Sequence, residues 1–441
     1  MLVAIGDHCP STVPTFLADD VDLGGQEGVG VTDHRPDIQI VLPVLDGDME
    51  RMAAFVEVGD DRLVAPIAVA VNDVATIAVS KQLGVEVRVV RPRVGVGTDP
   101  DFAHVRRMVP LARPLDPVQT AAMEHRFVDA LGTRIHLVEE GSGPLVLFVH
   151  GFPESWYSWR HQIPAVAGAG FRAVAIDVRG YGRSHAPLAV EDYRMVRHVA
   201  DNVGVVRALG EQTAVIVGHD WGAPIAWSSA LLRPDVFTGL GLLSVPYNPR
   251  SSFKPSDQFR LLGGAEEFYI EYFQTVGRAE AEIETDLAKW LLGFYYSASG
   301  DAPRGDGRGS MVHVGPTGRL VDRFAWPEAF PPWLAEADFA FYLEEFERTG
   351  LTGGLNRYRN VDRDWADLAA WDGAAITQPS IFIGGEKDGP TMWGSKAIAA
   401  FPQTMPNLTK SVIVPGCGHW VQQEEAELVN QELIEFLTTS S

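Results

Sequence analysis

The stretch of the chain with the clearest chemical potential is residues 218–222, Gly-His-Asp-Trp-Gly. It follows an apolar run at 214–217 and precedes a helix-like run at 223–232. A strand, a turn of the type small-x-nucleophile-x-small and a helix form a nucleophile elbow, in which glycines permit the sharp turn and the middle residue is exposed. The middle residue here is Asp220, where a serine would serve acyl transfer. A carboxylate is suited instead to displacing a leaving group from a saturated carbon.

An elbow nucleophile needs a base and a group that orients the base, and these follow along the chain in the order nucleophile, acid, histidine. Asp388 comes just after an apolar run at 380–383, and His419 just after a run at 411–414. Because each follows its own strand, both should lie at the same edge of the sheet as Asp220. We therefore predict a catalytic triad of Asp220, Asp388 and His419, with Glu386 as the alternative acid. His219 should point away from the nucleophile, and we interpret it as structural.

A second loop, His-Gly-Phe-Pro at residues 150–153, follows the apolar run at 145–149. Its glycine lets one backbone approach another closely, so the N–H of Phe152 can face the site. Together with the N–H of Trp221, it would form an oxyanion hole. The loop at 177–184 is interpreted as structural, because the helix after it lacks the glycine spacing of a dinucleotide site.

The elements that must position these residues alternate between strands and helices. We expect strands at 134–139, 145–149, 172–177, 214–217, 239–244, 380–384 and 411–414, and helices at 193–209, 223–232, 394–401 and 424–437. The glycine-rich turn at 141–144 predicts a hairpin that leads from the first of these strands into the second. The alternation predicts an α/β fold with a mostly parallel, doubly wound sheet.

The strand signal disappears between about residues 247 and 371. Aromatic-rich helical stretches replace it, at 266–273, 283–296 and 338–347. An insertion of this size after a central strand predicts a helical lid over the carboxyl ends of the strands, where such sheets bind ligands. The predicted domains are a first core segment at 123–247, the lid at 248–371 and a second core segment at 372–441.

The composition changes abruptly near residue 122. All 11 tryptophans and all 10 tyrosines lie beyond it, and residues 1–122 contain no motif or repeat. We expect this N-terminal extension, whose structure stays open, to be one of two things. It is either a small appended domain or upstream sequence from a start site placed too early, with Met123 as the true start.

The bulk properties exclude several classes of function. A net charge of -22 argues against binding to nucleic acid or to anionic membrane surfaces. The two cysteines, Cys9 and Cys417, are too few for a disulfide framework, and no metal-ligand spacing accompanies Cys417 and His419. Residues 1–10 do not have the pattern of a signal peptide, and the apolar segment 64–79 is too short and interrupted to span a bilayer.

From Met123 to the C-terminus the chain resembles epoxide hydrolases of the α/β-hydrolase superfamily, most closely the soluble actinobacterial type. The motifs at 150–153, 218–222 and 418–420 match, as do two lid segments, Tyr-Phe-Gln at 272–274 and Asn-Arg-Tyr-Arg-Asn at 356–360. The resemblance implies that Tyr272 and Tyr358 donate hydrogen bonds to the epoxide oxygen. Tyr269 is the nearest alternative, because it lies three residues before Tyr272 on a neighbouring part of the same helix face.

The resemblance also implies a mechanism. Asp220 opens the epoxide to give an alkyl-enzyme ester, and water activated by His419 and Asp388 hydrolyses this ester to a vicinal diol. A neutral tyrosine, with a pKa of about 10, can donate to the leaving oxygen at neutral pH. No cofactor and no metal are required. Aromatic side chains are the expected apolar walls of the substrate site, namely Phe152, Trp156, Trp333 and Trp420.

Two other functions stay open. A haloalkane or fluoroacetate dehalogenase would use the same triad, but haloalkane dehalogenases typically carry Asn where Phe152 stands. A non-catalytic ligand receptor of the same fold is the third hypothesis, and the intact triad counts against it. The expected partners are a small hydrophobic epoxide and water, without nucleic acid or a membrane span, and a homodimer is compatible with the sequence. A cytoplasmic location and a role in detoxification are expected.

Overall fold

The computed structural model describes residues 38–41, 52–58, 66–69, 123–304 and 309–440. The chain divides into two compact units, residues 1–96 and 97–441. In the first unit, the described residues form a three-stranded antiparallel sheet, in the order β1 (Ile38–Val41), β2 (Met52–Val58) and β3 (Pro66–Val69). Cys9 lies outside the described residues, as do the parts of segment 64–79 that flank β3.

The second unit is built around an eight-stranded sheet in the order β11-β10-β9-β8-β6-β7-β5-β4. All neighbouring pairs from β11 to β7 are parallel, while β5 and β4 are antiparallel at one edge. The strands are β4 (Glu124–Ala130), β5 (Thr133–Gly141), β6 (Leu145–Val149), β7 (Arg172–Ile176), β8 (Ala214–His219), β9 (Phe237–Leu243), β10 (Ser380–Gly385) and β11 (Leu408–Val414). The predicted fold class, a mostly parallel sheet with helices, is confirmed.

The predicted hairpin between the segments 134–139 and 145–149 is wrong. Strand β7 lies between β5 and β6, antiparallel to β5 and parallel to β6. The hairpin partner of β5 is β4, which joins it through a tight turn at Leu131 and Gly132, both with positive φ. Both edges of β5 are therefore already occupied, and residues 142–144 carry the chain past β7 to the position of β6.

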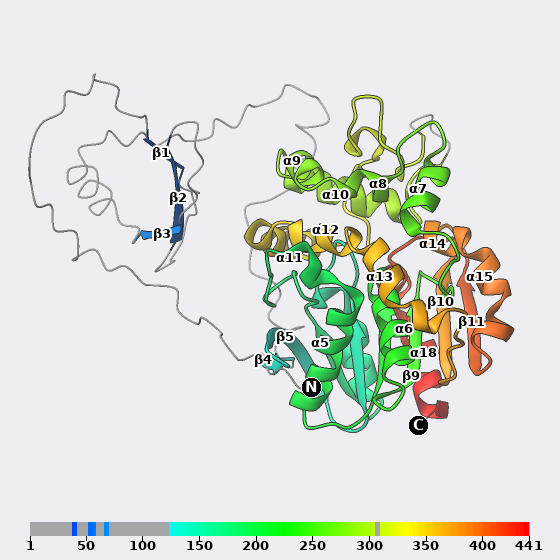
Figure 1. The fold of residues 1–441 in the computed structure, drawn as a ribbon. Coiled ribbons are helices and arrows are strands. Elements are labelled where there is room, and N and C mark those ends of the chain that lie inside the picture. Colours follow the sequence, from blue (N-terminus) through cyan, green and yellow to red (C-terminus); the bar gives the residue numbers. More distant parts are fainter. Residues whose placement is uncertain (1–37, 42–51, 59–65, 70–122, 305–308, 441) are drawn as a thin grey trace, which may run out of the picture. The chain divides into compact units, whose positions relative to one another are not determined.

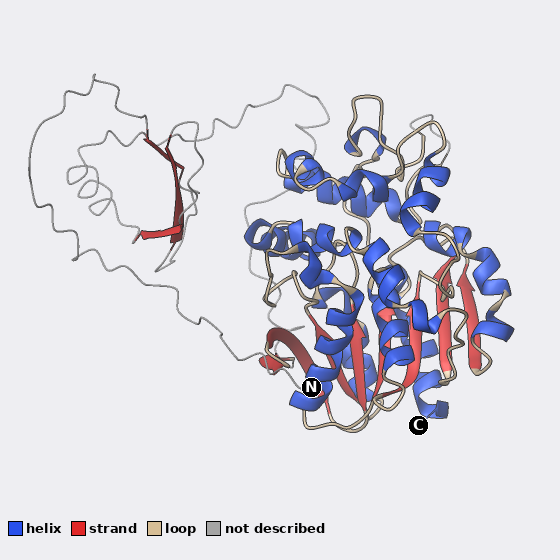
Figure 2. Ribbon diagram, viewed as in Figure 1, coloured by secondary structure: helices blue, strands red, loops and turns tan. Residues whose placement is uncertain are grey.

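Helices cover both faces of the sheet (Figure 2). The connection from β6 to β7 contains α4 (Gln162–Gly168), and the connection from β7 to β8 contains α5 (Met195–Ala208). These two crossovers run in opposite directions along the sheet, so right-handed connections place α4 and α5 on opposite faces. The elbow helix α6 (Gly222–Leu232) packs beside α5, and the C-terminal α18 (Ala426–Ser440) packs beside α4.

A helical segment is inserted between β9 and β10, over the carboxyl ends of the central strands (Figure 1). Its helices are α7 (Pro255–Gly263), α8 (Tyr269–Gln274), α9 (Arg278–Ile283), α10 (Leu287–Ala298), η3 (Val321–Arg323), α11 (Glu336–Thr349), α12 (Thr352–Tyr358), α13 (Val361–Asp367) and η4 (Ala369–Trp371). The remaining short helices of the unit are η1 (Trp156–Trp159), η2 (Val190–Tyr193), α14 (Gly389–Trp393), α15 (Ser395–Ala399), α16 (Phe401–Thr404) and α17 (Val421–Glu424). We call the inserted segment the lid.

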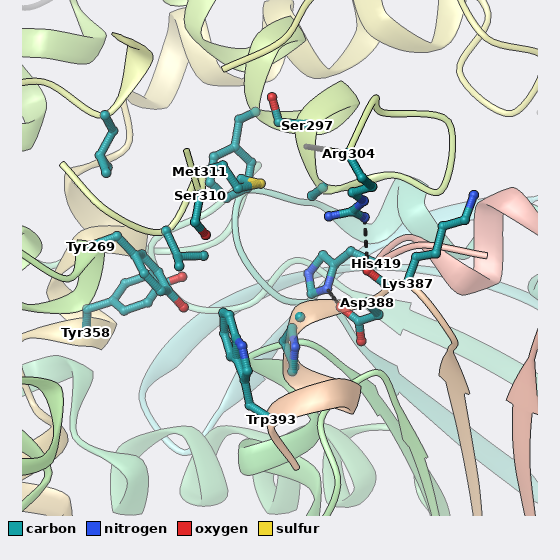
Figure 3. A pocket seen from close by; sticks show the side chains of 16 residues that line it. Tyr269, Ser297, Arg304, Ser310, Met311, Tyr358, Lys387, Asp388, Trp393 and His419 are labelled. Carbon is teal, nitrogen blue, oxygen red and sulfur yellow. Dashed lines mark hydrogen bonds and ion pairs between the residues drawn. The ribbon is translucent and has the colours of Figure 1, made fainter. Parts of the chain in front are cut away.

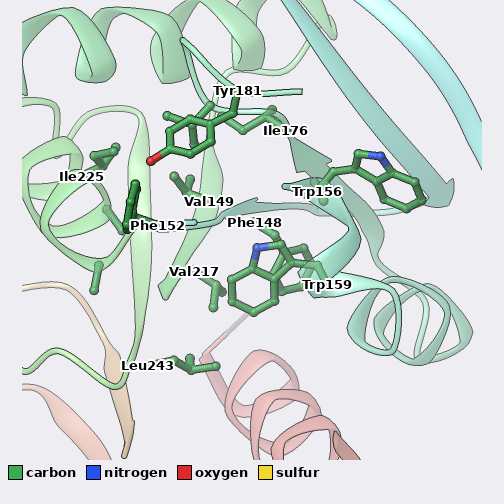
Figure 4. Close-up of a cluster of buried hydrophobic side chains, with 14 of the residues drawn as sticks. Phe148, Val149, Phe152, Trp156, Trp159, Ile176, Tyr181, Val217, Ile225 and Leu243 are labelled. Atoms are coloured by element: carbon green, nitrogen blue, oxygen red, sulfur yellow. The ribbon is translucent and has the colours of Figure 1, made fainter. Parts of the chain in front are cut away.

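The hydrophobic core holds the central strands in place. Every residue of β6 is buried, as expected for a parallel strand covered on both faces. Phe148 packs against Trp159 with a ring separation of 4.9 Å, close to Val217 of β8 (Figure 4). Burying each such large side chain contributes roughly 1.5–3 kcal/mol. Apolar packing of the central strands thus fixes the strand ends that carry the polar loops.

Candidate active site

Asp220 lies at the turn between β8 and α6, with a φ of 49°. This left-handed conformation is unusual for a residue with a side chain and stores on the order of 1 kcal/mol of strain. The two flanking glycines make the turn feasible. A Cβ on Gly218 would lie 2.1 Å from the carbonyl oxygen of Gly222, and a Cβ on Gly222 would lie 2.0 Å from that of Val149. The predicted elbow geometry is therefore present, with the carboxylate raised above the sheet.

Asp388 follows β10, and His419 follows β11. Because these strands are neighbours in the sheet, the two side chains lie in contact. The His419 ring lies with Nδ1 2.8 Å from Oδ1 of Asp388 and Nε2 3.5 Å from Oδ2 of Asp220. Asp388 is fully buried, and its Oδ2 accepts hydrogen bonds from the hydroxyls of Ser244 and Thr391 at 2.7 and 2.8 Å. These contacts fix the carboxylate, which in turn orients the imidazole.

The charges of the three groups are coupled. Burial opposes ionisation of Asp388, but the His419 ring and the two hydroxyls hold the pKa of this carboxyl below its ordinary value. Burial would lower the pKa of His419, but Asp388 and Asp220 together raise it well above the usual range. With Asp220 ionised, the imidazole is therefore protonated near neutral pH.

Glu386, the alternative acid, and His219, which we interpreted as structural, both make contacts away from the nucleophile. Oε2 of the exposed Glu386 accepts a hydrogen bond from the N–H of Gly416 at 2.8 Å, so Asp388 is the acid that faces His419. His219 lies between Oε2 of Glu154 at 2.9 Å and the carbonyl oxygen of His419 at 2.8 Å. His219 thus connects the elbow to the loop of the base.

Glu154 is a buried carboxylate that the sequence did not single out. It accepts hydrogen bonds from the N–H of Gly151 at 2.6 Å and from Nε2 of Gln422 at 3.0 Å, besides its contact with His219. Burial opposes its ionisation, but His219 and the other donors lower the pKa of Glu154 to about 2. This single carboxylate joins the three loops that carry Phe152, Asp220 and His419. The only sign of this role in the sequence was the position of Glu154 directly after the motif at 150–153.

The loop at 150–153 presents one backbone donor to the nucleophile. The Phe152 N–H donates to Oδ1 of Asp220 at 2.8 Å. A Cβ on Gly151 would lie 2.4 Å from this same Oδ1, so only glycine permits the approach. The second predicted donor, the Trp221 N–H, belongs to the residue after the nucleophile, and its role stays a prediction.

The lid places two tyrosines opposite the triad. Tyr358 ends α12 and Tyr269 begins α8, and their rings lie 6.0 Å apart. Figure 3 shows their hydroxyl groups side by side, facing the cavity that His419 and Asp388 also line. Burial and the nearby carboxylate of Asp220 raise the pKa of both hydroxyls, so both remain protonated at neutral pH.

Tyr272 is not brought to this cavity. Its hydroxyl donates to Oε2 of Glu282 at 2.6 Å, and the Arg278 guanidinium lies 4.2 Å from the centre of its ring. Residues three apart on a helix differ in direction by about 60°, which is enough to turn Tyr272 toward α9 while Tyr269 faces the cavity. The predicted tyrosine pair therefore has to be corrected from Tyr272 to the alternative, Tyr269. The Phe-Gln sequence that follows Tyr272 does not determine which side chain of this short helix faces the cavity.

The cavity beside the triad has a volume of about 110 Å³. Among the described residues, none of the four predicted aromatic walls lines it. Trp156 is buried in the core, against His125 and Phe341, and Trp333 donates from Nε1 to Asp301 at 3.1 Å. Phe152 packs behind Tyr358, and Trp420 packs behind His419, at ring separations of 5.2 and 4.6 Å. The apolar walls are instead Phe294, Ala298, Met311, Val312, Leu320 and Trp393.

Within the described residues, no group of three or more His, Cys, Asp or Glu side chains could hold a metal ion. In the same part of the chain, no helix is both long and apolar enough to cross a membrane. The cavity thus brings the two tyrosines together with His419 and Asp388, and Asp220 lies behind them in contact with His419.

Comparison with known proteins places this geometry in context. Residues 144–426 match the family model of the alpha/beta hydrolase fold. Epoxide hydrolase B of Mycobacterium tuberculosis (strain ATCC 25618 / H37Rv) is 43% identical over 347 residues, which cover 71% of this chain and 98% of that protein.

Solved structures agree with this similarity. An epoxide hydrolase from an endophytic Streptomyces is 61% identical, with a TM-score of 0.70 over 72% of this chain and 96% of that chain. Epoxide hydrolase A from Mycobacterium thermoresistibile is 42% identical, with a TM-score of 0.67 over 72% of this chain and 98% of that chain. The chain therefore belongs to the α/β-hydrolase fold family and, within it, to the epoxide hydrolases.

Proposed function

We propose that this protein hydrolyses epoxides to vicinal diols through a covalent ester on Asp220. The observation that carries the proposal is the pair of protonated hydroxyls, Tyr269 and Tyr358, on the opposite side of the cavity from His419 and Asp388. An epoxide oxygen is a poor leaving group, and two neutral donors supply what its departure requires. A dehalogenase would need donors for a halide instead, and the tyrosine pair does not favour it.

In the first half-reaction, Oδ2 of Asp220 attacks a ring carbon, and the bond from this carbon to the epoxide oxygen breaks. Oδ1 is held by the Phe152 N–H, so we assign the attack to Oδ2, whose neighbour is Nε2 of His419 at 3.5 Å. The departing oxygen takes a proton from the tyrosine pair. No base is needed, because a carboxylate is already an anion at neutral pH. The product is an alkyl ester of Asp220 that carries a hydroxyl on the neighbouring carbon.

The second half-reaction follows from the loss of charge on Asp220. Once Asp220 is an ester, only Asp388 still raises the pKa of His419, so the imidazolium can give up its proton and restore the one that the tyrosine pair lost to the substrate oxygen. His419 can then accept a proton from water, which attacks the ester carbonyl. Oδ1 becomes the oxyanion beside the Phe152 N–H, and when the bond from Cγ to Oδ2 breaks, Oδ2 leaves with the diol and takes the proton from His419. The proton of the new carboxyl group then passes to His419, which restores the starting state. Turnover should therefore fall at acid pH, where His419 of the ester form stays protonated, and the ester should accumulate.

The test separates the two half-reactions. In the variant His419→Gln, Asp220 should still be alkylated but not regenerated, so the protein should consume about one equivalent of styrene oxide and stop. Its mass should rise by the full mass of the substrate, on the peptide that contains Asp220. The control Asp220→Ala should show no adduct. An unmodified Asp220 in the His419 variant, alongside an active wild type, would falsify the covalent mechanism.

A further inference from the structure

Ser244 is a fully buried residue with a strained backbone, directly after β9. Its φ is 69°, and among the residues that the structure describes only Leu131, in the β4–β5 turn, and the nucleophile Asp220 share a positive φ without being glycine. A side chain in this region costs conformational energy that glycine would avoid. The Ser244 N–H donates to the carbonyl oxygen of Ile383 at 2.9 Å, which helps to hold the strained residue against β10. Strain kept in this way points to a task for the side chain.

The Ser244 hydroxyl lies between the acid and the base of the triad. It donates to Oδ2 of Asp388 at 2.7 Å, and its oxygen lies 3.1 Å from Nδ1 of His419. Because Nδ1 also lies 2.8 Å from Oδ1 of Asp388, this nitrogen carries a proton, which the carboxylate and the hydroxyl oxygen can share. The end of β9 thus adds a fourth group to those that follow β8, β10 and β11.

The position of Asp388 creates a difficulty for the base. A fully buried carboxylate in contact with an imidazole stabilises the protonated ring strongly, because little solvent screens the two charges. A hydroxyl that donates to this carboxylate takes up part of its negative charge and so weakens its hold on the proton. Thr391 donates to Oδ2 as well, at 2.8 Å, and Ser244 combines such a donation with its contact to the ring.

Other titratable groups also surround His419. Oδ2 of Asp220 lies 3.5 Å from Nε2, the His219 ring lies 4.9 Å away, and Glu424 binds backbone N–H groups on either side of the histidine. The groups that line the same cavity from the lid and from the core are Arg304, Lys387, Tyr269 and Tyr358. Asp220 loses its negative charge in the ester, so Asp388 is then the carboxylate that remains in contact with the ring.

We propose that Ser244 is a positioning residue for the base of the second half-reaction. Its hydroxyl accepts from Nδ1 of His419 and donates to Asp388, so the carboxylate orients the imidazole without keeping it protonated once Asp220 is an ester. This inference rests on the proposed function and assigns to Ser244 the control of the pH at which the ester is hydrolysed.

The direction of the effect follows from the two hydrogen bonds. Without the hydroxyl, more negative charge stays on Asp388, so the pKa of His419 in the ester form should rise. The loss of the hydroxyl oxygen as an acceptor matters less, because Nδ1 keeps its proton in both the neutral and the charged ring. A higher pKa leaves less neutral His419 at a given pH, so hydrolysis of the ester should slow down in neutral and acid solution.

The experiment measures hydrolysis of the ester apart from ring opening. Excess protein is mixed with styrene oxide, and the formation and decay of the ester are followed by mass spectrometry of quenched samples at several pH values. In Ser244→Ala, the pH midpoint of the decay rate should rise by about one unit, as expected for one lost hydrogen bond to a charged group. The decay rate should fall about tenfold below both midpoints and return to the wild-type value above them. Formation of the ester, which needs no base, should keep its rate.

Two further variants separate the hydroxyl from its surroundings. Ser244→Gly removes the same hydroxyl but accommodates the positive φ, so it should show the same shift of the midpoint with a higher stability to denaturant than Ser244→Ala. It also keeps the test valid if Ser244→Ala folds poorly. The matched control is Ser229→Ala on α6, where a fully buried hydroxyl donates to the carbonyl oxygen of Ile225 at 2.8 Å. This variant should keep the wild-type midpoint.

The outcomes are distinguishable. A midpoint that stays unchanged or falls in both Ser244 variants would overturn the inference and leave the covalent mechanism intact. Decay that slows by the same factor at every pH would also overturn it, because Ser244 would then support only the structure of the site. If Asp220 carried no adduct in either the wild type or His419→Gln, the proposed function would fail and this inference with it.

Discussion

The two halves of the candidate site hold their reactive groups in different ways. On the core side, each group is fixed by hydrogen bonds from polar neighbours, such as those of Ser244 and Thr391 to Asp388. On the lid side, Tyr269 and Tyr358 are held largely by aromatic rings, with Phe273 at 5.6 and 5.0 Å from the two. Hydrogen bonds set the charge and direction of the triad. Ring packing sets the positions of the two tyrosines, and the Tyr269 hydroxyl hydrogen-bonds with Tyr358, while the Tyr358 hydroxyl hydrogen-bonds with Trp221.

The largest effect should come from removing the lid hydroxyls. Tyr269→Phe or Tyr358→Phe alone should slow ring opening by about 10²-fold, by analogy with the loss of one oxyanion-hole donor, and the double variant should be nearly inactive. Because phenylalanine keeps the ring packing, binding of a diol product should persist. The burst of ester formation in single-turnover kinetics measures the ring-opening step directly.

Tyr272→Phe is the matched control on the same helix. It removes a hydroxyl bound to Glu282, away from the cavity, so the rate of ring opening should stay close to that of the wild type. If Tyr272→Phe stopped ring opening while Tyr269→Phe did not, the geometric assignment of the pair would be wrong.

A smaller effect, on stability rather than on chemistry, should follow from Glu154→Gln. The pKa of Glu154 is lowered from 4.5 to about 2 in the folded protein, so its ionised form stabilises the fold above pH 4.5. That contribution, on the order of 3 kcal/mol, should be lost progressively as the pH falls toward about 2. Chemical denaturation at several pH values should show this loss in the wild type and a flatter profile in the variant.

Glu386→Gln is the control for that measurement, since this exposed carboxylate makes one hydrogen bond, to the N–H of Gly416, in the same region of the core. It should leave the pH dependence of unfolding close to that of the wild type. If both variants changed the pH dependence of unfolding equally, the buried position of Glu154 would not be the cause of that dependence.

The smallest effect should come from deleting residues 1–122. Every residue that we place in the site lies beyond Met123, so the shortened chain should fold cooperatively and hydrolyse epoxides at an unchanged rate. Loss of activity in a folded, shortened protein would show that the extension contributes to the site.

The contrast between core and lid also explains which features the sequence could predict. The apolar runs at 214–217, 380–383 and 411–414 mark three strands near their carboxyl ends, so the places of Asp220, Asp388 and His419 could be predicted from the sequence. The lid residues depend on the rotation of short helices, and neither the choice between Tyr269 and Tyr272 nor the walls around Phe294 is fixed by local pattern. The predicted pairing of β5 with β6 was wrong for a related reason. Strand β7, which lies between them in the sheet, comes later in the chain than both.

The order of the reactive groups along the chain has a consequence during protein synthesis. A ribosome adds Asp220, which follows β8, and both lid tyrosines well before it adds His419, in the loop after β11. We expect a nascent chain that has folded only as far as β10 to be open to alkylation but unable to release the ester. Exposure of growing cells to epoxides would then inactivate unfinished copies of the enzyme while the finished copies kept turning over.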